Sequence, residues 1–177
     1  MNIEKFFLKS VGEWNSMRSS HTLAFQEFEE IRSRIKITPT KRNDSRVIKL
    51  LKDNLITNNE ENKGYLISWE AKSEWEEENQ KRNSSGDSIL IPIELSKTEG
   101  KIIRSVGYTE DIQVISLYKL LEDGSLIINS SYNHIFTEER IWFVSKNLRS
   151  RSSVTRAINS LAILQTSYAS EIRLIKQ

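Results

Sequence analysis

Apolar and polar residues alternate with a period of two along much of the chain, which predicts a protein built mainly from β-strands. Between residues 31 and 37, isoleucine or serine occupies every odd position and arginine or lysine every even one. Residues 65–75 repeat the alternation, with Ile67, Trp69 and Trp75 on one face. Both segments therefore predict long strands with one face in the interior and the other in solvent.

Ten segments carry this strand pattern. They are residues 14–25, 29–38, 65–75, 88–95, 101–108, 112–121, 125–132, 139–145, 148–155 and 164–176. Two stretches have helical spacing instead: residues 3–10, which end before Gly12, and residues 44–55, which Asp44 can cap. Strands spaced this evenly predict a β-barrel or a β-sandwich, and the pattern alone leaves both open.

Glycines suggest where the strands turn. Gly100 and the Glu-Asp-Gly at residues 122–124 are expected at tight hairpins, and residues 86–88 are expected in a turn at the end of a polar loop. An up-and-down barrel built from these strands would leave no sheet edge unpaired and would enclose space for one small ligand.

Length and charge exclude several classes of protein. The 177 residues fit a single domain spanning residues 1–177. The formal net charge is +2, from 26 basic and 24 acidic residues, far from the basic excess of a nucleic-acid-binding protein. No apolar run approaches the ~20 residues that span a bilayer, and residues 1–10 lack the pattern of a secretory signal. We therefore expect a soluble cytoplasmic protein that binds neither nucleic acid nor membrane.

The chain contains no cysteine, which restricts the chemistry available to it. Disulfides, thiolate metal sites and a cysteine nucleophile are excluded, and no ligand can be attached to this chain through a thioether. The two histidines, His21 and His134, are too few for a histidine-rich metal site, so no metal is expected. The sequence also lacks a glycine-rich phosphate loop and a nucleophile elbow.

Three separated segments form signatures, in order along the chain. Residues 6–21 read Phe-Phe-x-x-Ser-x-Gly-x-Trp-x-Ser-x-Arg-Ser-Ser-His. Residues 139–143 read Glu-Arg-Ile-Trp-Phe and are followed by Asn-Leu-Arg-x-Arg-x-Ser at 147–153, and residues 170–173 read Ser-Glu-Ile-Arg. Together these segments resemble the S-type phycobiliprotein lyases, the CpcS/CpeS group, over nearly the full length of the chain.

The resemblance implies a mainly β fold: a lipocalin-like up-and-down antiparallel β-barrel with one or two short helices. It also implies a lyase that binds an open-chain tetrapyrrole (bilin) non-covalently and directs its thioether attachment to a cysteine of an apo-phycobiliprotein subunit. Phycoerythrobilin is the favoured substrate and phycocyanobilin the second, with no permanently bound cofactor. A phycoerythrin subunit is the favoured partner, a bilin-synthesising reductase is a further candidate, and homodimer formation is left open.

Arg149, Arg151 and Ser153 alternate along one predicted strand, so their side chains emerge on the same face. Arginine binds carboxylates through two parallel hydrogen bonds. The resemblance assigns Arg149 and Arg151 to the two propionates of the bilin, with Ser153 as a further donor. From the pattern alone, a solvated basic strand face is the more common explanation.

Two carboxylates receive the catalytic role from the resemblance, Glu139 first and Glu171 second. Either could hold the pyrrole nitrogens or keep them protonated, which makes the ethylidene group of ring A more electrophilic. Without the resemblance, ordinary surface ion pairs with Arg140, Arg149 or Arg173 are the simpler explanation.

Trp69 and Trp75 share the apolar face of one predicted strand with Ile67, and these residues are candidates to line the pyrrole rings. Core packing is their alternative role. Arg18, from the first signature, is expected to point into the barrel, whereas Trp14 is assigned to the core.

A second class of protein stays open: a non-enzymatic lipocalin-type carrier of a bilin, a fatty acid or another apolar ligand. A paired-arginine pocket suits one carboxylate as well as two. Residues 76–87 and 157–165 depart from the family pattern, and these departures bear on which bilin and which acceptor the protein uses.

Overall fold

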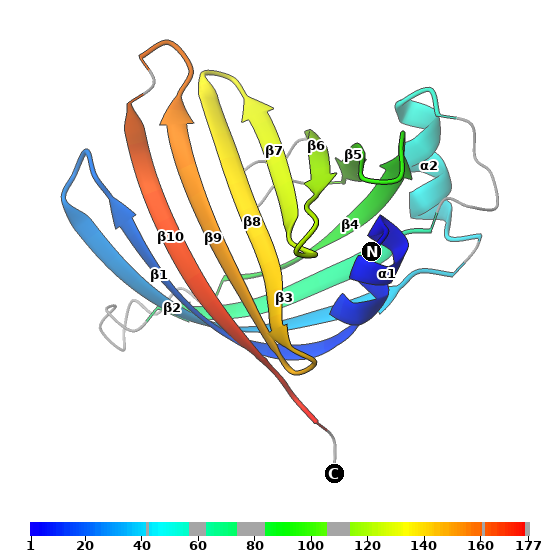
Figure 1. The fold of residues 1–177 in the computed structure, drawn as a ribbon, viewed down its shortest axis with the longest axis horizontal. Coiled ribbons are helices and arrows are strands. Elements are labelled where there is room, and N and C mark those ends of the chain that lie inside the picture. The colour runs from blue at the N-terminus through cyan, green and yellow to red at the C-terminus, as the bar shows by residue number, and fades with distance from the viewer. Residues whose placement is uncertain (42, 57–62, 74–83, 106–113, 161, 176–177) are drawn as a thin grey trace.

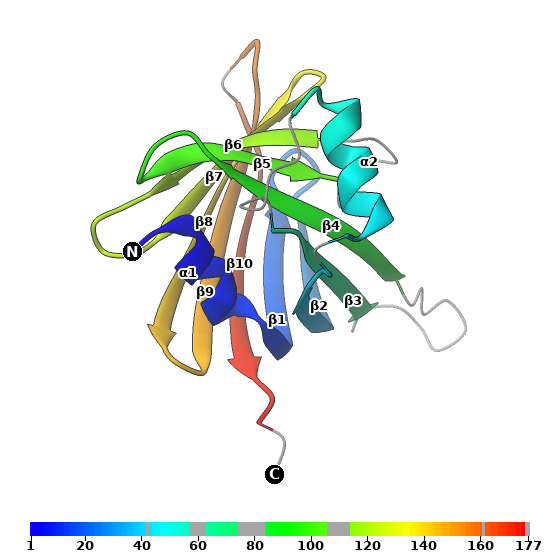
Figure 2. The ribbon, with the colours of Figure 1, turned by 90° about the vertical axis from the view of Figure 1, so that its right-hand side faces the viewer.

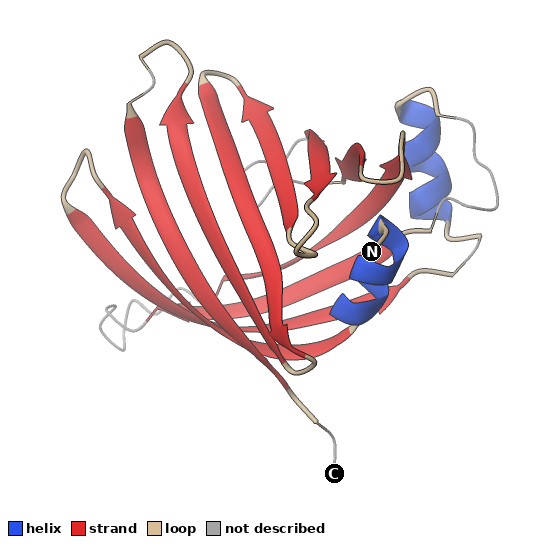
Figure 3. Cartoon of the chain, in the orientation of Figure 1, coloured by secondary structure: helices blue, strands red, loops and turns tan. Residues whose placement is uncertain are grey.

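The computed structural model describes all residues except 42, 57–62, 74–83, 106–113, 161 and 176–177. Within the described residues, ten strands and two helices follow one another along the chain (Figures 1 and 3). The strands are β1 (Gly12–Thr22), β2 (Glu27–Pro39), β3 (Tyr65–Ser73), β4 (Ser84–Glu94), β5 (Glu99–Arg104), β6 (Val114–Leu120), β7 (Leu126–Tyr132), β8 (Ile135–Ser145), β9 (Leu148–Ala157) and β10 (Ile163–Arg173). The helices are α1 (Ile3–Ser10) and α2 (Ser45–Asp53).

Each strand pairs antiparallel with the next one in sequence, and β1 also pairs with β10, which closes the sheet into a barrel. Trp14 of β1 lies opposite Arg173 of β10 on one side and Ile35 of β2 on the other. This closed up-and-down topology confirms the barrel rather than the sandwich. Its strand number exceeds the roughly eight of the smallest ligand-binding barrels, so the interior is correspondingly wider.

The ten strands correspond one to one to the ten predicted segments, although their ends differ by a few residues. The expected turn at residues 86–88 is wrong, because these residues lie inside β4. Gly86 faces Trp69 of β3, and a Cβ at position 86 would come within 2.6 Å of the indole. Gly100 is also a strand residue, in β5, where the absence of a side chain leaves room for Tyr118. Both glycines therefore serve close packing rather than a turn.

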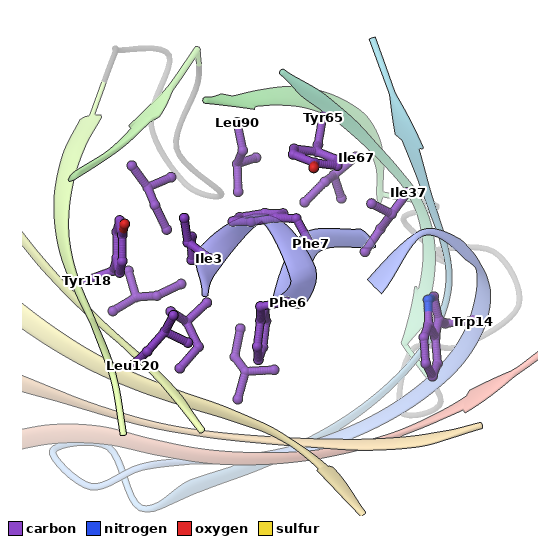
Figure 4. Packing of buried hydrophobic residues seen from close by; sticks show 14 residues of the cluster. Ile3, Phe6, Phe7, Trp14, Ile37, Tyr65, Ile67, Leu90, Tyr118 and Leu120 are labelled. Carbon is purple, nitrogen blue, oxygen red and sulfur yellow. The ribbon is translucent and has the colours of Figure 1, made fainter. Parts of the chain in front are cut away.

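Helix α1 fills one end of the barrel (Figure 4). Asn2 caps it by accepting a hydrogen bond from the backbone nitrogen of Lys5 at 3.0 Å. Its apolar face consists of Ile3, Phe6 and Phe7, which are buried among inward-facing strand residues. The strand residues of this cluster are Trp14, Ile37, Tyr65, Ile67, Leu90, Ile102, Tyr118, Leu120, Leu126, Ile128 and Ile141. This end of the barrel is therefore a packed apolar core.

Helix α2 packs on the outer face of the barrel, over β4 and β5 (Figure 2). Asp44 caps it as expected, with its carboxylate accepting a hydrogen bond from the backbone nitrogen of Arg46 at 3.0 Å. The helix and the strands beneath it form a second apolar cluster of Val47, Leu50, Leu51, Ile89, Ile91 and Ile103. No helix in the described part of the chain has the length and apolar character that crossing a membrane requires.

Candidate functional site

The interior of the barrel is apolar where α1 fills it and becomes polar toward the other end. Residues directly opposite one another on neighbouring antiparallel strands share a face, so the register shows which side chains point inward. Because Trp14 is buried beside α1, Ser16, Arg18 and Ser20 also face inward from β1. The matching polar residues of β10, β9 and β8 include Ser167, Glu171, Arg149, Arg151, Ser153, Thr137 and Glu139.

The exposure of the charged side chains increases along the strands away from α1, whereas Ser20 of β1 stays buried. The side chains of Glu171 and Arg149 are 1 % and 3 % exposed. That of Arg151, two residues further along β9, is 18 % exposed. Arg18 and Glu29 reach 45 % and 48 %. The polar part of the interior therefore opens to solvent at the end away from α1.

Four of the inward-facing residues form a continuous network of ion pairs across β8, β9 and β10. Nε of Arg149 donates a hydrogen bond of 2.5 Å to Oε2 of Glu171. Arg151 links the two carboxylates: its Nη2 lies 3.3 Å from Oε1 of Glu171 and its Nη1 lies 3.0 Å from Oε1 of Glu139. Two cations and two anions neutralise one another, which is what allows charged groups to persist at this depth.

Burial and charge act on Glu171 in opposite directions. Burial by itself would raise the pKa of this carboxyl group, but the charges of Arg151 and Arg149 and the hydrogen bond from Arg149 outweigh it, so the pKa of Glu171 lies below its ordinary value. Glu171 is therefore ionised near neutral pH. An ionised carboxylate in this place can accept hydrogen bonds from N–H groups of a ligand or stabilise a positive charge on it.

Ser153 and Arg18 also face the interior, as the sequence predicts. Oγ of Ser153 lies 2.7 Å from Oγ of Ser167, and Ser153 is opposite Glu139 on the neighbouring strand. Nη2 of Arg18 lies 3.9 Å from Oε2 of Glu29. The structure thus gathers Arg18, Ser153 and the four-residue network on one side of the interior, on β1, β8, β9 and β10.

The apolar candidates fall into three cases. Ile67 is 9 % exposed and belongs to the core cluster around α1, so the structure does not place it beside the ion pairs. Trp69 is half-buried and packs against the edge of the same cluster. Trp75 lies outside the described residues. Core packing thus accounts for Ile67.

Arg140 points away from the interior, whereas Glu139, its neighbour in the second signature, points inward. Its Nη2 lies 2.6 Å from Oδ2 of Asp123 and 3.1 Å from Oγ of Ser125, in the hairpin before β7. Glu139 therefore pairs with Arg151 and not with its neighbour in sequence. The carboxylates form ion pairs, but these pairs lie inside the barrel rather than on its surface.

Further polar residues of the interior are absent from the sequence-based candidates, among them Ser167 and Glu29. Ser167 has the same parity as Glu171 on β10, so strand alternation alone could have indicated it. Glu29 needs the register of β1 with β2, which places it opposite Ser20, and its carboxylate accepts a hydrogen bond of 3.4 Å from that serine. No pattern within one strand contains that information.

A comparison with known protein families gives a match along most of the chain. The family model described as CpeS-like protein matches residues 2–174. The chain belongs to the CpeS-like family.

CpeS-like relatives are similar to this chain in sequence and in structure. A protein of Trichodesmium erythraeum named chromophore lyase CpcS/CpeS 3 is 34 % identical over 175 residues, which cover 98 % of this chain and 99 % of the relative. A protein of Microchaete diplosiphon named putative phycoerythrobilin lyase CpeS is 34 % identical over 151 residues, 84 % of this chain and 66 % of the relative. The structure of the S-type phycobiliprotein lyase CPES from Guillardia theta matches with a TM-score of 0.86 and 32 % identity, and the match covers 100 % of this chain and 95 % of that one.

The lowered pKa of Glu171 predicts how stability depends on pH. A carboxyl group with a lowered folded-state pKa stabilises the fold fully above its unfolded value of about 4.3, and this contribution is lost as the pH falls through the folded value. We expect Glu171→Gln to reduce the free energy of unfolding near neutral pH by about 3–5 kcal/mol, since it breaks a buried ion pair. The loss of stability on acidification below about pH 4 should be smaller in the variant than in the wild type.

Urea denaturation at a series of pH values measures both effects. Glu122→Gln, at an exposed position in the hairpin between β6 and β7, is the matched control and should behave as the wild type does. Equal acid sensitivity of the wild type and Glu171→Gln would show that Glu171 is not held ionised by its arginine partners.

Proposed function

We propose that this chain is a phycobiliprotein chromophore lyase, which takes up a bilin non-covalently and directs its attachment to a cysteine of an apo-phycobiliprotein subunit. The observation that carries this proposal is the network of Glu139, Arg151, Glu171 and Arg149, which offers charges of both signs inside an open barrel. The names of the relatives, chromophore lyase and S-type phycobiliprotein lyase, support the same activity.

Arginine side chains suit the propionates of a bilin, because a guanidinium group binds a carboxylate through two parallel hydrogen bonds. Arg151 is the partly exposed cation of the network, and Arg18 lies nearer the open end. We assign the first propionate contacts to these two residues, with Ser153 as a further donor. Arg149 is almost fully buried on Glu171, so we assign it to holding the network beneath the propionates.

Carboxylates suit the other polar groups of a bilin, the pyrrole N–H groups. Glu139 is 15 % exposed and reaches the interior from β8, whereas Glu171 lies deeper. We propose that Glu139 is the principal partner of the pyrrole nitrogens and that Glu171 is the second. A negative charge there favours the protonated, positively charged pyrrole system. Protonation draws electrons from the ethylidene group of ring A and prepares it for attack.

The transfer step is an addition of a thiol across a carbon–carbon double bond. The thiolate sulfur of the acceptor cysteine forms a bond to the ethylidene carbon, the electron pair of the double bond moves into ring A, and the ring takes up one proton. No oxidant or reductant is needed. This chain supplies no thiol, since it has no cysteine, so the attacking sulfur comes from the acceptor. Its contribution is orientation, which lets the addition proceed at one carbon and from one face.

We favour phycoerythrobilin over phycocyanobilin as the substrate, and a phycoerythrin subunit as the acceptor. The relative named as a putative phycoerythrobilin lyase supports this choice. Trp69, and Trp75 from beyond the described residues, are the proposed aromatic contacts of the pyrrole rings. A bilin-synthesising reductase that releases its product to this barrel remains a candidate partner.

The proposed function predicts a coloured, non-covalent complex and directed transfer. Mixing the protein with phycoerythrobilin should sharpen and shift the visible absorption band. Acid denaturation should then release all pigment from this chain, and addition of the apo-phycoerythrin subunit should move the pigment to the acceptor band of a zinc-stained denaturing gel. Pigment that stays on this chain in the gel would contradict non-covalent binding. A band change without any effect on the acceptor would instead identify a carrier.

The outward position of Arg140 provides a matched control for the arginines of the network. We expect Arg151→Ala, which removes a proposed propionate contact, to weaken bilin binding by on the order of 1.5–3 kcal/mol, the range for hydrogen bonds to charged groups. Arg149→Ala should weaken binding through loss of the ion pair that holds the network. Arg140→Ala removes a surface contact with Asp123 and should leave the affinity within about twofold of the wild type. Spectral titration measures the three affinities. Equal affinities of all three variants would show that the propionates bind elsewhere.

Glu139→Gln should separate binding from transfer. The amide keeps the size of the side chain and can accept a hydrogen bond through its oxygen, but it carries no negative charge near neutral pH. We expect the variant to bind bilin with a blue-shifted or broadened band and to transfer it more slowly. Glu171→Gln should have a smaller effect on the transfer rate. The measurements are the visible spectrum of each complex and the yield of linked product with acceptor in excess. An unchanged spectrum and rate for Glu139→Gln would remove this residue from the mechanism.

A further inference from the structure

A stack of side chains connects α1 to the ion-pair network, with Trp14 at its centre. Cζ of Arg149 lies 4.8 Å from the centroid of the Trp14 ring, and Cζ of Arg173 lies 4.1 Å from it. Both distances are within the range of about 6 Å for cation–π interactions. Trp14 is 0 % exposed, so these contacts are shielded from water, where such interactions are strongest.

The indole of Trp14 is fixed in place from several sides. Its Nε1 donates a hydrogen bond of 2.9 Å to the carbonyl oxygen of Ser10, the last residue of α1. Its ring centroid lies 6.2 Å from that of Phe143, with the planes inclined by 53°. Rotation of the indole would break a buried hydrogen bond and open a cavity. The ring is therefore a rigid platform for the two guanidinium groups.

Arg173 ties this platform to the end of α1. Its guanidinium group donates to the carbonyl oxygens of Lys9, at 2.5 Å, and of Val11. These carbonyls lie at the negative end of the helix dipole, where a cation is favoured. Gly12 provides the space for this contact, because a Cβ there would come 2.5 Å from Nη1 of Arg173. Arg173 thus contacts the ring of Trp14 and the end of the helix at the same time.

Residues from all three sequence signatures meet in this stack. Gly12 and Trp14 come from the first, Arg149 from the second, and Glu171 and Arg173 from the third. The core of the barrel alone does not require two arginines beside a buried tryptophan.

We propose that Trp14, fixed by Arg173, is a positioning residue of the bilin site: its ring holds the guanidinium group of Arg149 against Glu171 and thereby orients the carboxylate that Arg151 shares. Trp14 acts through Arg149 and not through contact with the bilin. The inference rests on the proposed function for its effect on bilin, whereas its effect on Arg149 can be measured without any ligand.

The ligand-free test compares arginine side chains by NMR. In the wild type, the buried Nε–H of Arg149 should give a resolved resonance that exchanges slowly with water, because it is bonded to Glu171. Trp14→Leu should lose this protection, whereas Trp14→Phe, which keeps a ring, should retain most of it. Phe6→Leu is the matched control, since Phe6 is a buried aromatic residue of the same cluster and also packs on Phe143, at 5.3 Å between ring centroids. In Phe6→Leu, the Arg149 Nε–H should exchange with water as slowly as in the wild type.

The second test repeats the comparison with phycoerythrobilin. Trp14→Leu should bind the bilin about two- to thirty-fold more weakly, which is the worth of one cation–π contact expressed as a ratio of affinities. The visible band of its bilin complex should change in the same way as that of Glu171→Gln. Trp14→Phe should restore most of the wild-type affinity and most of the wild-type band. Phe6→Leu should also lower the urea midpoint, because it removes part of a buried ring, while keeping the wild-type band and affinity.

The outcomes separate this inference from the proposed function. A wild-type protein that shows no band change with bilin rejects the proposed function, and the NMR comparison still decides whether Trp14 positions Arg149. The inference would be overturned if Trp14→Leu kept the wild-type Arg149 Nε–H resonance and the wild-type visible band with bilin. It would also be overturned if Phe6→Leu changed the resonance and the band in the same way as Trp14→Leu does. If Trp14→Leu does not fold, Arg173→Gln replaces it, because this side chain is partly exposed. A wild-type Nε–H resonance in Arg173→Gln would then overturn the role of the stack.

Discussion

The ion pair between Arg149 and Glu171 is the interaction on which the polar interior of the barrel depends. Both side chains are almost fully buried, so either charge alone would lose its hydration without compensation, at a cost of several kcal/mol. Arg151 extends the neutralisation to Glu139, which is nearer the solvent. Each member of the network is thus stabilised by the opposite charges of its neighbours. The orientation of the outer members therefore follows from the pair at the bottom.

The closed barrel determines how a packed core and a polar site share the same strands. The inward-facing residues of β1 and β8 are aromatic near α1, as with Trp14 and Phe143, and those farther from α1 on β9 and β10 are polar, as with Ser153 and Ser167. Because α1 fills one end with Phe6 and Phe7, the polar residues lie where the interior opens. On β1 and β8, the apolar core and the polar residues thus occupy opposite ends of the same strands, and the ion pair of Arg149 and Glu171 lies between them.

Strand periodicity predicts much of this architecture but not the contacts between strands. The parity of Arg149, Arg151 and Ser153 correctly places them on one inward face, and Arg140 falls on the other face as its parity requires. Pairing of Arg149 with Glu171 depends on the register of β9 with β10, and the register shift between Ile163 and Gln165 contributes to it. A bulge of this kind leaves no mark in a pattern of period two. For the same reason the sequence does not reveal that Gly86 is a packing site for Trp69, or that Trp14 lies against two arginines.

Charges of both signs in the interior favour a bilin over a fatty acid as the ligand. A fatty acid carries a single carboxylate for Arg151 and no hydrogen-bond donor for Glu139 or Glu171. Its apolar tail would also leave these carboxylates without new partners. A bilin presents propionates that match the arginines and N–H groups that match the carboxylates, so that each charge gains a complementary group when water leaves. We therefore expect the inner carboxylates, more than the arginines, to discriminate between a tetrapyrrole and a fatty acid.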